Sequence, residues 1–167
     1  MKLNLKQFVN RSQLQVMRDL CKGEEGEHFV STIEALKNTI ATMPATYDTD
    51  GQGDDAIVHL HYFTGASDWW ITERDCEQEQ LQAFGFVCLN GWVDDAELGY
   101  ISIDELIKHG AELDLYWRTK TVGEIKSKLK PQQKCNMTES ELTLAFAEGL
   151  FTDDEYITIL GDIRGAA

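Results

Sequence analysis

Two histidines separated by one residue form the strongest metal-ligand pattern in this sequence. His59 and His61 would project from the same side of a β-strand, because side chains alternate along a strand. Paired imidazoles serve in zinc and non-haem iron sites, where a neighbouring strand adds a third ligand. Glu73 or Asp68 is a candidate for that ligand. A metal site of His59, His61 and Glu73 is one hypothesis. The competing one, which we favour, is a half-buried sheet surface that needs no cofactor.

The string Asp68–Asp75 offers carboxylates for general acid–base chemistry. In a strand, Glu73 would share a face with Trp69 and Ile71, and apolar neighbours raise the pKa of a carboxyl group. A catalytic pair needs a second carboxylate, for which Glu97 is the candidate. The simpler interpretation is that Glu73 accepts hydrogen bonds from a turn. The sequence has neither Gly-x-Ser-x-Gly nor a phosphate-binding glycine loop, so it favours a protein that is not an enzyme.

Charge is concentrated in one part of the chain. The segment Asp48–Asp114, here called the acidic block, holds 16 of the 29 acidic residues and two of the 15 basic ones. Its net charge therefore equals the −14 of the whole protein, and three of the four tryptophans lie inside it. Phosphate binding requires Lys and Arg, so this block is not expected to contact nucleic acid. The exception is Arg118–Lys134, whose six basic residues make a DNA-contacting regulator a further alternative.

An acidic, aromatic surface fits a protein partner better than a substrate. Aromatic side chains and clustered charges anchor protein–protein interfaces. Carboxylates in the predicted turns would line one rim of the sheet and imitate the phosphates of duplex DNA. The sequence thus predicts a non-enzymatic accessory protein with a protein partner, for example a host nucleic-acid-binding defence protein that it antagonises by DNA mimicry. The alternative is a metal-dependent or carboxylate-based enzyme. The predicted contact residues are Tyr62, Trp70, Trp92, Asp94, Asp95 and Glu97.

The elements that position these residues follow from the hydrophobic pattern. Apolar residues at helical spacing predict two N-terminal helices, the first capped by Ser12 and the second, about Glu27–Met43, ended by Pro44. Five strand-like segments rich in β-branched and aromatic residues follow, separated by Gly, Asp or Asn. They are AIVHLHYF, DWWITERD, QAFGFVCLN, ELGYISI and AELDLYW.

Four capping boxes, in which a Ser or Thr precedes a Glu by three residues, predict short helices. They begin at Ser102, Thr121, Thr138 and Thr152. The fold class is therefore α+β, with a mainly antiparallel sheet of about five strands, an N-terminal helix pair and C-terminal short helices. We expect three parts, namely a helical segment 1–46 that packs on the sheet, an acidic α+β core 47–130 and a C-terminal helical hairpin 131–167.

Several strings of the acidic block, in their order and spacing, resemble a bacterial family, domain of unknown function 2958. The matching residues are Trp69 and Trp70 with Glu73, Gly85, Glu97-Leu98-Gly99-Tyr100, Glu105-Leu106 and Asp114. The resemblance covers about Ile57–Lys126, and the chain departs from it at Gly65 and Thr119, where the family usually has proline. It implies a gene carried on phages, plasmids or integrative elements, and no catalytic residues. Physically, Gly99 suggests a bulge or a close backbone approach.

The remaining features concern the C-terminus and the compartment. The string AFAEGLFTDDEYITIL resembles short helical-hairpin modules. No apolar run approaches the ~20 residues of a membrane span, and the N-terminus lacks the apolar stretch of a signal peptide. The four cysteines form neither a Cys-x-x-Cys pair nor a zinc spacing. We therefore expect a reduced, cytoplasmic protein that does not contact a membrane.

Overall fold

The computed structural model describes residues 4–77, 79–129, 139–147, 149, 156–157 and 160–161. The chain forms two compact units, Met1–Pro131 and Gln132–Ala167. The segments 1–46 and 47–130, expected as separate parts, fall together in the first unit. In the second unit, an α-helix, α5, spans Glu139–Ala147.

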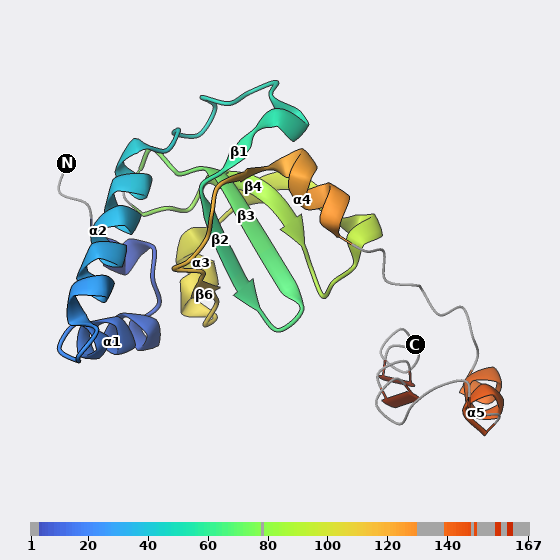
Figure 1. Ribbon diagram of the computed structural model, residues 1–167. Helices are drawn as coiled ribbons and strands as arrows, with labels where there is room; N and C mark the ends of the chain where they lie inside the picture. Colours follow the sequence, from blue (N-terminus) through green and yellow to red (C-terminus); the bar gives the residue numbers. More distant parts are fainter. Residues whose placement is uncertain are drawn as a thin grey trace. The chain divides into compact units, whose positions relative to one another are not determined.

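Strands in the described part of the first unit form two sheets. They are β1 (Ile57–Val58), β2 (Leu60–Thr64), β3 (Ser67–Glu73), β4 (Ala83–Cys88), β5 (Glu97–Ile101), β6 (Glu112–Leu113) and β7 (Lys120–Thr121). The larger sheet is antiparallel and has the order β5-β4-β3-β2-β6, of which Figure 1 labels β4, β3, β2 and β6. Each of the five predicted segments supplies one of its strands, and the α+β class is confirmed. The smaller sheet pairs β1 with β7.

Along the sequence, the helices of the first unit precede, interrupt and follow the strands. They are α1 (Arg11–Leu20), α2 (Gly26–Thr42), α3 (Ile103–Lys108) and α4 (Val122–Lys128), with 3-10 turns η1 (Leu5–Gln7), η2 (Gly53–Asp55) and η3 (Val93–Asp95). The N-terminal helix pair is confirmed. Asn10, not Ser12, caps α1, because its side chain accepts a hydrogen bond from the backbone N–H of Gln13 at 2.8 Å. No helix among the described residues has the length and apolarity needed to cross a membrane.

Two of the four predicted capping boxes lie in described residues. At α4 the box is complete, since Thr121 and Glu124 exchange hydrogen bonds with each other's backbone N–H. At α3, the Ser102 hydroxyl accepts from the backbone N–H of Glu105 at 3.2 Å. The boxes that begin at Thr138 and Thr152 lie outside the described residues.

The larger sheet buries an apolar core on both of its faces. One face, here called the helix-pair face, packs against α1, α2 and α3. Its core includes Leu60, Tyr62 and Ile71 from the sheet and Met17, Ile40 and Ile103 from the helices. The other, here called the α4 face, packs against α4 and the small sheet. Its core includes Trp70, Phe86 and Cys88 from the sheet and Val58, Val122 and Ile125 from the covering elements.

An irregularity in β3 changes which face its last residue occupies. The register between β3 and β4 runs from Ile71 opposite Gly85 to Glu73 opposite Phe84, so two residues of β3 oppose one of β4. Such a bulge shifts the side-chain alternation by one position. Glu73 therefore lies on the α4 face, and the predicted face shared by Trp69, Ile71 and Glu73 is wrong.

Candidate functional site

Two of the six predicted contact residues are in the core. Tyr62 is 0% exposed on the helix-pair face, and its hydroxyl donates to the Phe8 carbonyl at 2.7 Å. Burial raises the pKa of Tyr62, so the hydroxyl stays protonated. Trp70 is 6% exposed and belongs to the core of the α4 face. The prediction of a contact role is wrong for both residues, because both faces of the sheet are covered.

The other four predicted contact residues gather at one turn. Residues 89–96 connect β4 to β5 and include the 3-10 turn η3; together with Glu97, the first residue of β5, they are here called the acidic turn. Trp92 is 47% exposed. The carboxylates of Asp94, Asp95 and Glu97 are exposed beside it. The turn therefore combines a large aromatic side chain with three negative charges on the surface.

The acidic side chains do not line one rim of the sheet. Glu77 and Glu79 lie in the connection from β3 to β4, whereas Asp94 and Asp95 lie in the connection from β4 to β5. Successive connections of an antiparallel sheet lie at opposite ends, so a strand of about 20 Å separates the two pairs. Asp54 is also neutralised, because Lys126 of α4 lies 2.6 Å from its Oδ1. The prediction of a single acidic rim is wrong.

Glu73 anchors the loop that precedes β1. It is 3% exposed. Its Oε2 accepts the backbone N–H of Tyr47 at 2.8 Å, and its Oε1 accepts the backbone N–H of Thr49 at 2.6 Å together with the Thr49 hydroxyl. This arrangement matches the simpler interpretation of Glu73, a carboxylate that holds a turn. Proton transfer to a substrate would require these bonds to break.

Glu97, the proposed second carboxylate, is not close to Glu73 across the sheet. In the sheet register Glu97 stands opposite Val87, and Val87 in turn stands opposite Trp69. Val87 and Trp69 both pack on the core of the helix-pair face. Glu97 therefore projects from the face opposite to Glu73, and the structure does not form the carboxylate pair.

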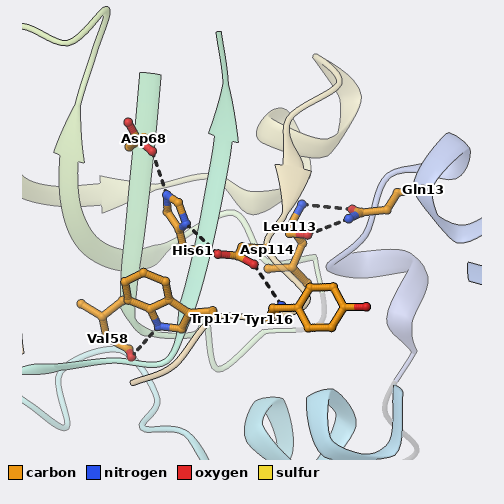
Figure 2. A network of polar contacts seen from close by, with 8 residues as sticks. All are labelled: Gln13, Val58, His61, Asp68, Leu113, Asp114, Tyr116 and Trp117. Atoms are coloured by element: carbon orange, nitrogen blue, oxygen red, sulfur yellow. Dashed lines mark hydrogen bonds and ion pairs between the residues drawn. The ribbon is translucent and has the colours of Figure 1, made fainter. Parts of the chain in front are cut away.

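His61 lies between two aspartates, Asp68 and Asp114 (Figure 2), and its ring also contacts two tryptophans. Its Nε2 is 2.8 Å from Oδ1 of Asp68, and its Nδ1 is 3.5 Å from Oδ2 of Asp114. The imidazole stacks on Trp70, with ring centroids 5.5 Å apart and planes 7° apart, and its centroid is 5.0 Å from that of Trp117. Only a doubly protonated imidazole can donate to both carboxylates.

This cluster holds one segment of the chain against the sheet. The backbone N–H of Asp114 donates to the His61 carbonyl at 2.9 Å, and the indole N–H of Trp117 donates to the Val58 carbonyl at 3.1 Å. Both contacts fasten the chain after β6 to β1 and β2, and Figure 2 shows the bond from Trp117 to Val58. A general base needs a ring nitrogen that can face a substrate. Because each nitrogen of His61 faces a carboxylate, the arrangement fits fastening better than catalysis.

The hypothetical metal ligands do not form a site. His59 lies between β1 and β2, where its backbone N–H donates to the Ile71 carbonyl at 2.8 Å. Partial burial lowers the pKa of His59 and favours the neutral ring. Within the described residues, no group of three or more His, Cys, Asp or Glu side chains could hold a metal ion. The structure therefore does not assemble His59, His61 and Glu73 as a ligand set.

Cys88 stands opposite Asp68 in the register of β3 and β4. It is 1% exposed. Burial, and to a lesser extent the negative charge of Asp68, raise the pKa of Cys88. A nucleophilic cysteine requires the opposite shift, since the thiolate is the reactive form. Cys88 is therefore a core residue.

Sequence reasoning placed Asp68 beside the histidine pair, as a candidate metal ligand, but missed Asp114 and Trp117 as partners of His61. Asp114 is 53 residues away from it in the chain, and hydrophobic periodicity carries no signal for such a pairing. One signal existed, because Asp114 follows the last strand-like segment directly and is one of the residues that match the resembled family. Trp117 lies just outside the acidic block. The pattern of predicted strands gave no indication that its indole contacts β1.

Comparison with known proteins adds no information about the roles of these residues. No protein-family model, curated protein or solved structure matches the chain. The resemblance of about Ile57–Lys126 to domain of unknown function 2958 therefore stays a prediction.

Proposed function

We propose that this protein is a non-enzymatic accessory protein that binds a positively charged protein partner through the acidic turn and the adjacent strand β5. One observation carries this proposal: a well-anchored turn presents Trp92 and three carboxylates at the surface, next to the edge of the sheet. Tryptophan is enriched among the residues that dominate binding energy, and clustered charge speeds association with an oppositely charged partner.

The acidic turn is held in place from inside the fold. The Asn90 backbone N–H donates to the Ser67 hydroxyl at 2.9 Å. Val93 and Ala96 pack on the core of the α4 face. Asn90 and Gly91 both have positive φ, 53° and 69°, a backbone conformation that sharply reverses the chain. A turn that is already ordered loses little conformational entropy on binding, which favours affinity.

Strand β5 adds a backbone surface to this turn. It is the last strand of the sheet, and its outer edge pairs with no described strand. The opposite edge differs, because the side chain of Gln13 exchanges hydrogen bonds with the Leu113 backbone of β6 at 2.6 and 3.0 Å (Figure 2). An unpaired edge can accept an extended segment of another protein as an additional strand. The β5 edge is therefore the better place for a partner segment.

The nature of the partner follows from charge and from the resemblance. The acidic turn has three carboxylates and no basic residue, so it suits a surface rich in Lys and Arg, as on nucleic-acid-binding proteins. The resemblance of about Ile57–Lys126 supports a role for a mobile genetic element, and antagonism of a host defence protein in the cytoplasm is the form we propose. DNA mimicry here involves the acidic turn alone, because the carboxylates do not form a continuous row.

The test compares two variants with equal charge change. One carries Asp94→Lys, Asp95→Lys and Glu97→Lys in the acidic turn. The control carries the same three reversals at Glu24, Glu25 and Glu27, which are exposed between and at the start of the N-terminal helices. Each protein is immobilised and exposed to lysate of the bacterial host, and bound proteins are identified by mass spectrometry with and without competing duplex DNA.

The proposal predicts that basic DNA-binding proteins captured by the wild type are lost with the acidic-turn variant, kept by the control and displaced by duplex DNA. Circular dichroism of both variants verifies that they are folded. Equal capture by the two variants, or captured proteins that are not basic, would contradict the proposal.

A further inference from the structure

A pocket lies beside β5 on the α4 face, at the loop that Glu73 anchors. Its volume is about 300 Å³. Apolar side chains of Phe84, Leu98 and Ala56 form part of its lining, and the loop Thr46–Gly53 supplies the rest together with Glu73 and Tyr100. Two of the lining residues, Leu98 and Tyr100, belong to the edge strand β5. The pocket therefore adjoins the edge proposed to receive a partner segment.

Two tyrosines and two carboxylates give this pocket its character. Tyr47 and Tyr100 meet edge to face, with ring centroids 6.3 Å apart and planes 69° apart. Asp50 and Glu73 supply negative charge, and of the described residues that line the pocket none is a lysine or an arginine. A hydrogen bond with Tyr47, and the negative charges of Glu73 and Asp50, raise the pKa of Tyr100, as expected where these groups lie close together.

The backbone at the rim is held in an unusual conformation. Tyr47 has a φ of 81°, in the left-handed region that bulky residues rarely adopt. Glu73 stabilises it by accepting the Tyr47 backbone N–H, so the tyrosine ring stays at the rim with 64% of the residue exposed. Strained residues persist only where surrounding contacts over-determine them, and they gather at binding sites. Among the described residues, the Tyr47 ring belongs to neither of the two apolar cores.

We propose that this pocket binds the side chain of a lysine or arginine carried by an extended segment that pairs with β5. This inference rests on the proposed function and names the feature of the partner that it recognises. Aromatic rings attract cations to their faces, and Asp50 supplies the opposite charge. The apolar lining suits the aliphatic stem of either side chain.

The geometry of an added strand delivers such a side chain to the pocket. Residues directly opposite each other on paired strands have Cβ atoms about 5 Å apart. A residue that pairs with Leu98 or Tyr100 would project on the α4 face, where both of these side chains line the pocket. From that position, the side chain of a lysine or arginine is long enough to bring its charged group into the pocket. An acidic or short side chain at the same position would not fill the pocket.

The test uses small probes that isolate the pocket from the rest of the interface. N-acetyl-arginine methylamide and N-acetyl-citrulline methylamide have nearly the same shape, but only the first is charged. Each is titrated to about 20 mM, within the weak affinity expected of one side chain, into the full-length protein. Binding is followed by the backbone amide signals of Tyr47, Thr49 and Tyr100 in two-dimensional NMR spectra.

We expect saturable shifts of these amide signals with the arginine probe and not with the citrulline probe. Asp50→Asn combined with Tyr100→Ala should weaken arginine binding about tenfold, the sum of a cation–π contact and an exposed ion pair. The matched control, Asp19→Asn with Tyr116→Ala, changes the same residue types outside both the pocket and the acidic turn and should bind as the wild type does. Equal shifts with both probes, no shifts, or equal loss in both variants would overturn the pocket assignment.

The pocket and the proposed function can fail separately. If partner capture depends on the acidic turn while the arginine probe does not bind, only the pocket assignment is wrong. If the probe binds and capture is insensitive to the acidic turn, the pocket stands and the proposed function falls.

Discussion

Glu73→Ala tests whether the buried carboxylate is an anchor or a chemical group. The change leaves the backbone N–H groups of Tyr47 and Thr49 without the acceptor that they share. A buried donor without a partner costs about 1–3 kcal/mol, and water reaches this loop in part, so the lower half of that range applies to each donor. For the two donors together we therefore expect the free energy of unfolding to fall by about 2–4 kcal/mol, or roughly 10 °C in Tm.

Urea denaturation followed by tryptophan fluorescence measures this loss. Glu79→Ala is the matched control, because Glu79 is an exposed glutamate of the same acidic block, and such a change shifts the free energy of unfolding by less than about 0.5 kcal/mol. Glu73→Gln should give an intermediate loss, since one carbonyl oxygen remains and an NH₂ group faces the other donor. If Glu73→Ala and Glu79→Ala unfold at the same urea concentration, the anchoring role is wrong and Glu73 becomes a candidate acid or base again.

Two further predictions concern stability. A Cβ at Gly85 would lie 2.1 Å from the Trp70 carbonyl oxygen, whereas one at Gly99 on the neighbouring strand would meet nothing within 4 Å. Gly85→Ala should therefore lower the free energy of unfolding by about 3 kcal/mol or more and Gly99→Ala by less than about 1 kcal/mol, and similar urea midpoints for the two would refute this. The second is a pH dependence. Burial raises the pKa of Asp75, but hydrogen bonds from the backbone N–H groups of residues 77, 82 and 81 outweigh it and hold the pKa below the usual 3.8. Asp75 thus stabilises the fold above that value and loses this effect as the pH falls through its lowered pKa, so Asp75→Asn should flatten the acid side of a stability–pH curve, and parallel curves would contradict it.

The sequence predicted the strands, but it did not predict which faces of the sheet are covered by other elements. Five runs of β-branched and aromatic residues predict five strands because alternation is a local property of the chain. Whether a strand face is open depends on elements far away in sequence, here α1 and α2 on one side and α4 on the other. Tyr62 and Trp70 looked like surface aromatics for that reason. The face of Glu73 was mispredicted through a single bulge, which shifts every following side chain and has no strong sequence signal.

Contacts between distant loops were the least predictable part of the site. The bonds from Glu73 to residues 47 and 49 join segments more than 20 residues apart, although the turn-anchoring role itself was among the interpretations of the sequence. The pairing of His61 with Asp114 depends on where the chain returns after β6, which the strand pattern does not encode. Local propensity specifies elements, and tertiary packing decides which polar groups meet.

The glycines of β4 and β5 have different roles. The fold requires a glycine at position 85, whereas position 99 has free space around it. Gly99 was expected to permit a bulge or a close backbone approach, but the register around it is regular and a side chain there would meet open space, so that interpretation is wrong within the described fold. The close approach belongs to Gly85, its neighbour across the strands. The fold thus explains Gly85 and leaves Gly99 without a packing reason. Side chains of a strand project out of the plane of the sheet, so a Cβ at position 99 would not obstruct a partner segment that pairs with the edge of β5. Gly99→Ala should therefore leave both stability and partner capture almost unchanged, and a loss of capture would show that the partner lies over the face of β5 at this position and not along its edge.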